Sequence, residues 1–244
     1  MKPGTLRDDL RILRQFAVGL RGEGDHASRL EAFYGPQAAR YDAFRERLLR
    51  GRAELLARLA PRPGGHFVEL GAGTGRNIGF LGEAARGLEI TLVDLCPSLA
   101  AVARARYATE GNVSVVEADA TRWQPARAAN YVLLSYALTM MPDWRGVIDN
   151  AHRMLAPGGS IAVVDFHVSA AQPAPGRARH GWLARQFWRR WFGHDGVLLD
   201  PAHVDRLIAL FETRHLGEHS ARLPWLPGLR APYYLYIGRR RADG

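Results

Sequence analysis

From His66 onward, short runs of β-branched and other apolar residues alternate with stretches of helical character. This alternation is typical of a parallel sheet covered by helices on both faces, and it constrains the fold more than any other feature of the chain. The expected strands are His66–Leu70, Leu88–Asp94, Val113–Ala118, Tyr131–Tyr136 and Ser160–Phe166. The expected helices are Arg76–Ala85, Ser98–Thr109 and Trp144–Leu155. The last helix is expected to stop at residues 156–159, which read APGG and predict a turn.

The C-terminal part of the chain continues this pattern. Asp200 and Pro201 are typical of a helix start, and the helix is expected to run to about Leu210. Two further strands, Thr213–Ser220 and Tyr233–Gly238, are expected to close the sheet. The fold class predicted from this order of elements is α/β.

Two segments lie outside the alternation, and we expect both to cover the site. Residues 27–59 are predicted to be largely helical, with interruptions at Gly35-Pro36 and at Gly51. A linker rich in proline and alanine, residues 169–176, is followed by an aromatic and basic stretch at residues 181–193.

The length of 244 residues suits one domain better than two. We therefore expect residues 1–60 to form a helical cover over the active site. Residues 61–244 are expected to form a single domain that is one compact unit with this cover.

Composition excludes several classes of protein. Apolar residues make up 47% of the chain, which is too many for a disordered tail. Cys96 is the only cysteine, so an internal disulfide and a cysteine-built zinc site are excluded. No apolar run approaches the roughly 18 residues of a membrane-spanning helix, and residues 1–10 lack the apolar core of a signal peptide. A cytoplasmic location is the resulting expectation.

The charge of the chain is strongly positive. There are 33 basic and 24 acidic residues, which gives a formal net charge of +9, and Lys2 is the only lysine. A basic surface favours negative partners such as nucleic acid, an anionic membrane or a phosphorylated substrate. The alternative is that most of these arginines belong to solvated surfaces.

A glycine-rich turn follows the first expected strand and leads into a helix. Residues 71–75 read GAGTG, and glycine at these positions lets the backbone approach a ligand closely. The spacing differs from the G-x-G-x-x-G pattern of dinucleotide sites. Glu69, at the end of the strand, suits a cationic or amine-bearing ligand better than a pyrophosphate, because a carboxylate repels phosphate.

Acidic residues also follow the next two strands. Asp94 ends the second strand, where a carboxylate can accept hydrogen bonds from both hydroxyls of a ribose. Asp119 follows the third strand, where it can accept a bond from an adenine amino group while the N–H of Ala120 meets a ring nitrogen. Together with the glycine turn, these residues predict a site for adenosine without phosphates.

With these motifs in this order, the chain from about Leu30 to its C-terminus resembles the class I S-adenosylmethionine-dependent methyltransferases. The resemblance implies an enzyme that uses S-adenosyl-L-methionine, with a Rossmann-like seven-stranded sheet whose last strand is antiparallel. The residues that the resemblance implies around the cofactor are Glu69, Gly71, Ala72, Gly73, Asp94, Leu95, Asp119, Ala120, Ser135 and Tyr41.

Several short segments resemble more closely the N-methyltransferases of betaine-lipid synthesis, which trimethylate the amine of diacylglyceryl-homoserine. They are also similar, less closely, to bacterial phosphatidylethanolamine N-methyltransferases. The resemblance implies a lipid substrate at an anionic membrane surface, a peripheral position on the inner membrane, and a partner enzyme that supplies the aminocarboxypropyl lipid. The segments are FYGPQ (33–37), YD (41–42), RERLLRGR (45–52), GRN (75–77) and LSYALTMMPDW (134–144).

The end of the fourth strand is the catalytic position of this fold, and here it reads Ser135-Tyr136. The Asn/Asp-Pro-Pro-aromatic loop of nucleic-acid amino methyltransferases is missing there. Cys96 lies on the cofactor side, where packing is its expected role, and Asp165 alone does not make a metal site. The remaining acceptors are small molecules or lipids in which an amine nitrogen or a carbon atom is methylated.

An amine must lose its proton before it attacks a methyl group, and a side-chain oxygen can hold its N–H bonds in line. We expect Tyr136 and Ser135 to do this as catalytic residues, and we expect His167, after the fifth strand, to accept the proton. For each of the three, the alternative role is packing in the core.

The predicted substrate-binding residues lie in the N-terminal cover. Tyr34 and Tyr41 are expected to close over the site, and Arg47 and Arg52 to bind an anion of the headgroup. A guanidinium pairs well with the carboxylate of homoserine or the phosphate of phosphatidylethanolamine. The cofactor's own carboxylate and a solvated helix face are the alternatives for these arginines.

Residues 179–192 read RHGWLARQFWRRWF and have a helical distribution of apolar and basic side chains. Arginines beside tryptophans suit an anionic bilayer interface. Packing of the apolar half on the core of the domain is equally open. The apolar half consists of Leu183, Ala184, Phe187, Trp188, Trp191 and Phe192, whereas the other half holds Arg185, Gln186, Arg189, Arg190 and Trp182.

Two alternatives to a lipid N-methyltransferase stay open at this point. One is a small-molecule methyltransferase of the quinone or natural-product type. The other is a nucleic-acid-binding module that uses the basic surface. The missing motif at the fourth strand and the half-apolar character of the basic stretch argue against the module, so no nucleic-acid partner and no metal are expected.

Overall fold

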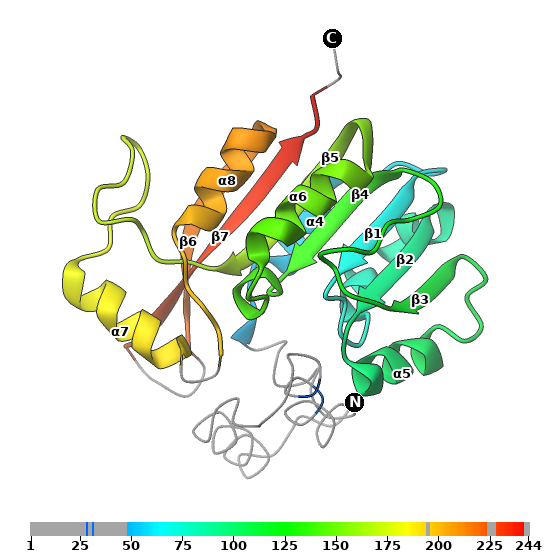
Figure 1. Ribbon diagram of the computed structural model, residues 1–244, viewed down its shortest axis with the longest axis horizontal. Coiled ribbons are helices and arrows are strands. Elements are labelled where there is room, and N and C mark those ends of the chain that lie inside the picture. The colour runs from blue at the N-terminus through cyan, green and yellow to red at the C-terminus, as the bar shows by residue number, and fades with distance from the viewer. Residues whose placement is uncertain (1–27, 29–30, 32–47, 194–195, 224–227, 242–244) are drawn as a thin grey trace.

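The computed structural model describes residues 28, 31, 48–193, 196–223 and 228–241. Its centre is a seven-stranded sheet in the order β3-β2-β1-β4-β5-β7-β6 (Figure 1). Strands β1 to β5 pair in parallel, and β7 is antiparallel to both of its neighbours. The predicted fold class, with its antiparallel last strand, is therefore confirmed. The strands are β1 His66–Leu70, β2 Glu89–Asp94, β3 Val113–Glu117, β4 Ala129–Ser135, β5 Leu155–Phe166, β6 Glu212–Arg222 and β7 Arg230–Arg239.

Helices cover both faces of the sheet (Figure 1). Helix α6 shows why these segments fold as they do: the Asp143 side chain accepts a bond of 2.9 Å from the N–H of Gly146, and the apolar side chains recur at helical spacing on its buried face. The helices are α4 Arg52–Leu59, α5 Pro97–Arg106, α6 Trp144–Met154, α7 Trp182–Gly193 and α8 Ala202–Leu210, with short 3-10 helices η2 Arg76–Phe80, η3 Gly82–Gly87 and η4 Leu138–Met140.

Two local expectations are wrong. The helix expected over Arg76–Ala85 is split into η2 and η3, because Gly82, the first residue of η3, has a φ of +57°, which an α-helix cannot continue through. The turn expected at residues 156–159 lies inside β5 as an irregularity of the ladder. Gly158 has a φ of +74° there, and its N–H donates to the carbonyl of Arg240 at 3.2 Å.

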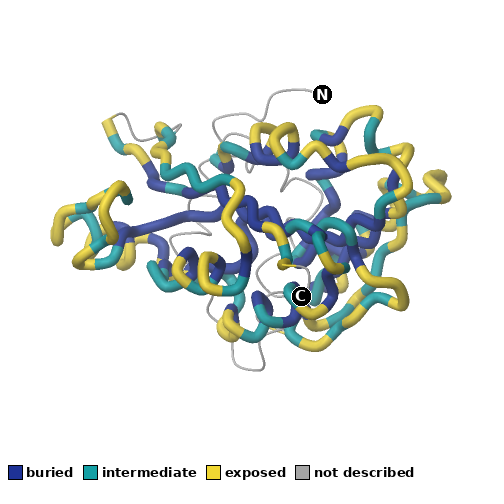
Figure 2. Tube along the Cα trace, turned by 90° about the horizontal axis from the view of Figure 1, so that it is seen from above, coloured by how far each residue is buried: buried dark blue, intermediate teal, exposed yellow. Residues whose placement is uncertain are grey.

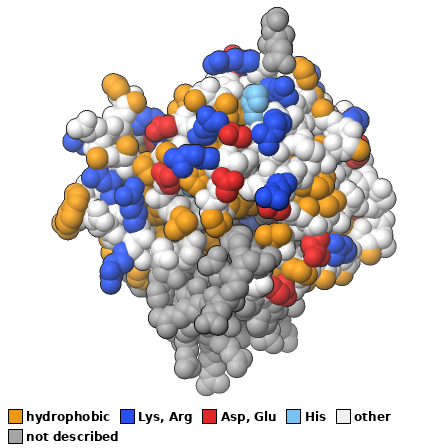
Figure 3. Space-filling view, in the orientation of Figure 1, with side chains coloured by type: hydrophobic (Ala, Val, Ile, Leu, Met, Phe, Trp, Pro, Cys, Tyr) orange, Lys and Arg blue, Asp and Glu red, His pale blue; other side chains and the backbone are white. Residues whose placement is uncertain are grey.

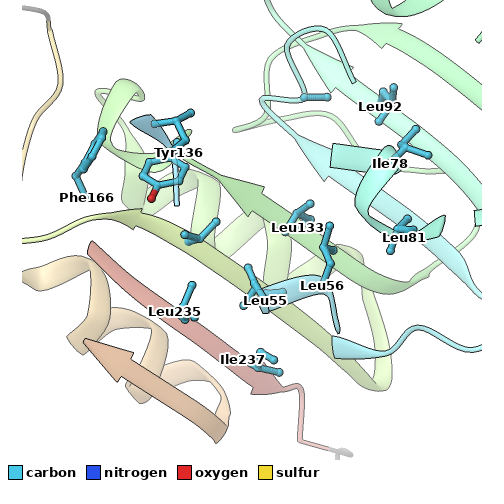
Figure 4. Close-up of a cluster of buried hydrophobic side chains, with 14 of the residues drawn as sticks. Leu55, Leu56, Ile78, Leu81, Leu92, Leu133, Tyr136, Phe166, Leu235 and Ile237 are labelled. Atoms are coloured by element: carbon cyan, nitrogen blue, oxygen red, sulfur yellow. The ribbon is translucent and has the colours of Figure 1, made fainter. Parts of the chain in front are cut away.

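The core lies on both faces of the sheet, and the central strands are the most deeply buried part of the chain, whereas the edge strands β3 and β6 are exposed or half-buried (Figure 2). On one face, α6 and α8 pack through side chains such as Ile148 and Leu207. On the other face, Leu55 and Leu56 of α4 and Trp188 of α7 join the cluster around Leu133 and Tyr136 (Figure 4). Parallel central strands need cover on both sides, and every residue of β1 is accordingly buried.

The described part of the N-terminal cover is anchored directly to the sheet. Helix α4 contacts β5 and β7, and it begins after Gly51, whose φ of +82° accounts for the interruption expected there. Tyr34, Tyr41 and Arg47 lie outside the described residues, and so does the interruption expected at Gly35-Pro36. In the part of the chain that the structure describes, no helix is long and apolar enough to cross a bilayer.

Candidate active site

The glycine turn folds against the second strand. Gly71, Gly73 and Gly75 all have positive φ angles, of +68°, +56° and +69°. The N–H groups of Gly71 and Ala72 both donate to the carbonyl of Val93, at 2.8 and 3.0 Å. A Cβ on Gly71 would meet Ala137 at 2.7 Å, so the turn also lies directly against the segment after β4. Glycine is the residue that both adopts a positive φ readily and has no Cβ to collide with Ala137.

Asp94 connects this turn to the start of α5. Its Oδ2 accepts a bond of 2.6 Å from the N–H of Gly73, and its Oδ1 accepts one of 2.9 Å from the N–H of Cys96. Hydrogen bonds from N–H groups to a carboxylate are among the stronger ones in proteins. The carboxylate therefore holds the glycine turn in place as well as facing the site.

A cavity of about 380 Å³ lies at the carboxyl ends of the central strands. Its walls hold three carboxylates, Asp94, Asp119 and Asp143, and Arg122 is the only basic side chain among its described lining residues. Much of the remaining wall is apolar, with Leu99 from α5 and Met140 from η4. A crevice at this edge of an α/β sheet is the usual ligand position.

The residues present fit S-adenosyl-L-methionine. Two carboxylates at neighbouring strand ends can bind the ribose hydroxyls and an adenine amino group, and the close-packed glycine turn leaves room for backbone contact. A pyrophosphate would need several basic or N–H donors and would be repelled by Asp94 and Asp119. The volume of the cavity also lies in the range of sites for molecules of this size.

Most of the predicted cofactor residues meet at this cavity. Those that line it are Gly71, Gly73, Asp94, Leu95, Asp119 and Ala120. Glu69, Ala72 and Ser135 are buried beside it and do not line it. Glu69 accepts a bond of 2.6 Å from the Asn77 side chain, which places its carboxylate inside the fold. The hydroxyl of Ser135 has no hydrogen-bond partner among the described residues.

Tyr136 lines the cavity directly after β4. Its hydroxyl donates to the carbonyl of Arg50 at 2.7 Å, and its ring packs edge-on against Phe166 with centroids 4.8 Å apart (Figure 4). Burial raises the pKa of Tyr136 well above its ordinary value, so the phenol stays a hydrogen-bond donor. Its φ of +53° is a left-handed conformation that costs about 1–3 kcal/mol and occurs mostly at functional positions.

The variant Tyr136→Phe tests the role of this hydroxyl. We expect turnover to fall roughly ten-fold, because one buried hydrogen bond is worth about 1–1.5 kcal/mol, while the affinity for S-adenosylhomocysteine changes less than about two-fold. Steady-state kinetics and calorimetry measure the two quantities. Equal losses in both would mean that the side chain acts through packing alone.

His167 lies away from this cavity. Its Nε2 is 2.9 Å from Glu218 Oε1, and it lines a second cavity of about 300 Å³ together with Arg177 and Asp205. Burial acts to raise the pKa of Glu218, but bonds from His167, Arg177 and the N–H of Ala178 outweigh it and hold the pKa at about 2. The structure therefore does not bring His167 to the reacting end of the first cavity.

Arg52 is likewise placed inside the fold. It is buried, and it donates to the carbonyl of Leu49 at 3.2 Å and to the side chain of Asn77 at 3.3 Å. Its guanidinium lies 5.1 Å from the centre of the Phe80 ring. Arg52 is not among the residues that line the two cavities.

Two further residues shape the cavity and were not predicted to do so. Asp165, at the end of β5, accepts bonds from the hydroxyl and the N–H of Thr139 at 2.7 and 3.1 Å, and so holds the wall segment η4. Burial raises the pKa of Asp165 to about 6. Glu31 accepts bonds from the N–H of Ser98 at 3.1 Å and from the thiol of Cys96 at 3.2 Å, at the cavity rim. A lone acidic residue in an apolar run is the only sequence signal for Asp165, and we see none for Glu31.

The residues that the structure describes contain no group of side chains that could bind a metal ion. Nowhere within residues 28, 31, 48–193, 196–223 and 228–241 do three or more His, Cys, Asp or Glu side chains gather as they would around an ion. Cys96 is buried, and desolvation raises the pKa of its thiol to about 11, so it is a poor nucleophile.

Comparison with known proteins supports this assignment of the cavity. Residues 41–218 match the family described as a methyltransferase domain. Trans-aconitate 2-methyltransferase of Methylobacterium radiotolerans is 30% identical over 174 residues, which are 71% of this chain and 63% of the relative. Demethylmenaquinone methyltransferase of Thermus thermophilus is 29% identical over 143 residues, 58% of this chain and 61% of the relative. The chain thus spans less than two thirds of the length of these relatives.

Solved structures share the fold. The N-methyltransferase NodS from Bradyrhizobium japonicum, in complex with S-adenosyl-L-homocysteine, has a TM-score of 0.65 and 19% identity, with 86% of this chain and 97% of that chain covered. Phosphoethanolamine N-methyltransferase 2 of Haemonchus contortus, in complex with S-adenosyl-L-methionine, has a TM-score of 0.66 and 13% identity, with coverages of 90% and 61%.

Proposed function

Because this chain belongs to the methyltransferase domain family and uses S-adenosyl-L-methionine as its cofactor, we propose that it methylates the amine of a lipid headgroup. The proposed substrate is diacylglyceryl-homoserine, and the product is its trimethyl betaine lipid. A partner enzyme would supply the aminocarboxypropyl lipid, and the chain would work at the inner face of the membrane.

One observation carries this proposal: aromatic rings connect the cofactor cavity to an exposed apolar helix. Tyr136 packs on Phe166 at 4.8 Å, Phe166 on Phe192 at 4.3 Å, and Phe192 on Trp188 at 5.6 Å between ring centroids. Phe192 and Trp188 belong to α7, whose outer face carries exposed tryptophans. These packed rings link the wall of the cavity to a helix with exposed apolar side chains, and such surroundings suit an acceptor with an apolar body and a polar end better than a small polar acid.

The residues of the cavity explain how a methyl group reaches an amine. When bound, S-adenosyl-L-methionine supplies an electrophilic methyl group that the nitrogen lone pair displaces from sulfur. Asp94, Asp119 and the glycine turn would hold the nucleoside end in a fixed position, which is the main contribution that an enzyme makes to an in-line displacement. The apolar side chains of Met140 and Met141 desolvate the acceptor and so favour the neutral amine over the ammonium ion.

The aromatic rings would also stabilise the product. The first two methylated products would each lose a proton to solvent before the next transfer, and the third would carry a permanent positive charge. The ring of Tyr136 lines the cavity, and Phe166 packs against it. A cation over such a ring gains about 0.5–2 kcal/mol. Neither ring needs to accept a proton for this.

Methyl transfer from labelled S-adenosyl-L-methionine to purified diacylglyceryl-homoserine tests the proposal. We expect label in the lipid phase, with products that carry one, two and three added methyl groups by mass spectrometry. Phosphatidylethanolamine, trans-aconitate and a demethylquinone are assayed in parallel, because the curated relatives bear the names of such small acceptors. Label in one of these acceptors and none in the homoserine lipid would overturn the assignment.

A second measurement concerns intact cells. Lipid profiles of cells with and without this chain should differ in the betaine lipid and its unmethylated precursor. Identical lipid profiles, in cells that make the precursor, would contradict the proposed substrate.

A further inference from the structure

Helix α7 carries both buried and exposed apolar side chains. Trp188 and Phe192 are buried against the core, as one alternative for this stretch predicted. The exposed fractions of the side chains that face outward are 63% for Trp182, 75% for Leu183, 40% for Phe187 and 41% for Trp191. Packing on the core therefore accounts for only part of the apolar half, and a second partner is needed for the rest.

We call these four exposed side chains the α7 surface. Leu183, Phe187 and Trp191 are spaced by four residues and so lie in one row along the helix, and the rings of Phe187 and Trp191 are in contact with centroids 5.6 Å apart. Leu198, with 51% of its side chain exposed, follows the helix. Its N–H donates to the carbonyl of Thr139 at 2.7 Å, so the chain that carries it is attached to the cavity wall.

The charged side chains of helix α7 itself are all positive. Helix α7 contains Arg185, Arg189 and Arg190 and no acidic residue. Arg189 and Arg190 are exposed, and neither has an ion-pair partner among the residues that the structure describes. Figure 3 shows arginine and apolar side chains side by side on the part of the molecule where α7 lies. This combination complements a surface that is apolar inside and anionic outside.

The α7 surface is also held in a fixed orientation. The segment before the helix is tied to β6, since both Arg177 and the N–H of Ala178 donate to Glu218. Ser169 and His180 exchange two further bonds: the N–H of Ser169 donates to the His180 ring at 3.0 Å, and the N–H of His180 donates to the Ser169 hydroxyl at 2.9 Å. A preordered surface loses little conformational entropy when it binds.

We propose that the α7 surface binds the headgroup region of an anionic phospholipid bilayer. Trp182, Leu183, Phe187 and Trp191 enter the interface, and Arg189 and Arg190 contact lipid phosphates. The inference deepens the proposed function and rests on it for the identity of the lipid that is methylated. Bilayer binding would hold the membrane next to the helix whose buried rings pack, through Phe166, against Tyr136 of the cavity wall.

Cosedimentation of the full chain with vesicles tests the α7 surface. We expect binding to vesicles that contain phosphatidylglycerol, binding at least ten-fold weaker to pure phosphatidylcholine, and a fall in affinity with salt. The triple variant Leu183→Ser, Phe187→Ser, Trp191→Ser should bind more than ten-fold more weakly, because three apolar side chains that would leave water on binding are lost. Arg189→Gln with Arg190→Gln should mainly reduce the preference for anionic lipid.

The matched control is Ile208→Ser, which removes an exposed apolar side chain from α8 on another part of the molecule. It should bind vesicles like the unchanged chain. Thermal melting of every variant shows whether the fold is kept. Absence of binding by the unchanged chain, or equal binding by the triple variant, would overturn the inference. A dimer that light scattering detects and that only the triple variant loses would overturn it too, since the α7 surface would then join two copies of the chain.

The failure of this inference can be told apart from the failure of the proposed function. The lipid substrate is assayed in vesicles and as a short-chain form dispersed in detergent. We expect the triple variant to lose activity on vesicles and to keep it on the dispersed substrate. Vesicle binding without any lipid methylation would contradict the proposed substrate alone, whereas methylation of both forms without vesicle binding would contradict the α7 surface alone.

Discussion

Replacement of Asp94 by alanine should weaken the binding of S-adenosyl-L-homocysteine roughly 100-fold. The variant removes the expected acceptor for the ribose hydroxyls, and it also removes the carboxylate that holds the N–H groups of Gly73 and Cys96 at 2.6 and 2.9 Å. Hydrogen bonds to a charged group contribute about 1.5–3 kcal/mol each, and 1.4 kcal/mol corresponds to a factor of ten in affinity. Isothermal titration calorimetry gives the affinity directly.

Glu117→Ala is the matched control for this prediction. Glu117 pairs with Asp94 in the register of β2 and β3, but it is exposed and does not line the cavity. Its replacement should leave the affinity unchanged. The affinity of Asp94→Asn for S-adenosyl-L-homocysteine should lie between those of Asp94→Ala and Glu117→Ala, because the amide oxygen of asparagine keeps one hydrogen-bond acceptor. If Asp94→Ala folds normally and binds as tightly as the unchanged chain, the cofactor does not lie against β2.

Gly71→Ala should destabilise the fold and nearly abolish cofactor binding. The added Cβ would lie 2.7 Å from Cβ of Ala137 and 2.9 Å from Cε of Met141, both of which line the cavity. Alanine at a φ of +68° is strained as well, by about 1–2 kcal/mol. The crowding adds to this strain, so we expect a loss of about 2–4 kcal/mol in the free energy of unfolding and an affinity for S-adenosyl-L-homocysteine at least ten-fold lower.

Gly82→Ala separates the two causes. Gly82 has a φ of +57°, and nothing lies within 4 Å of the position its Cβ would take. This variant carries the backbone strain without the crowding and should lose only about 1–2 kcal/mol in chemical denaturation, with cofactor affinity unchanged. Similar losses of stability and affinity in both variants would mean that Gly71 is required only for its backbone conformation.

The meeting of Asp94, Asp119 and the glycine turn at one cavity could be predicted from the sequence because it depends on local chemistry. Each strand of a parallel sheet ends at the same edge, so Asp94 and Asp119 had to lie near the glycine turn once the strands were recognised. The order and direction of the strands follow from the same alternation. These parts of the structure need no information about distant contacts.

The acceptor half could not be predicted in this way because it depends on contacts between distant segments. His167 was expected at the reacting end, yet Glu218 of β6 holds it beside a different cavity, and nothing near His167 in the chain indicates that partner. Asp165 acts through Thr139, which reaches it only because η4 folds back over the end of β5. Helix α7 has apolar residues on both sides, so its periodicity alone did not divide the buried from the exposed ones.

The bond from the Tyr136 hydroxyl to the Arg50 carbonyl has a consequence for dissecting this protein into fragments. This bond joins residues 86 positions apart in the chain. Leu55 and Leu56, which follow Arg50 in the same segment, pack in one hydrophobic cluster with Leu235 (Figure 4). A fragment that starts at β1 would keep every strand. It would, however, expose the Tyr136 hydroxyl and the apolar side chains around Leu235 to water. Such a fragment should aggregate, so the smallest piece that stays monodisperse must retain α4 and the residues just before it.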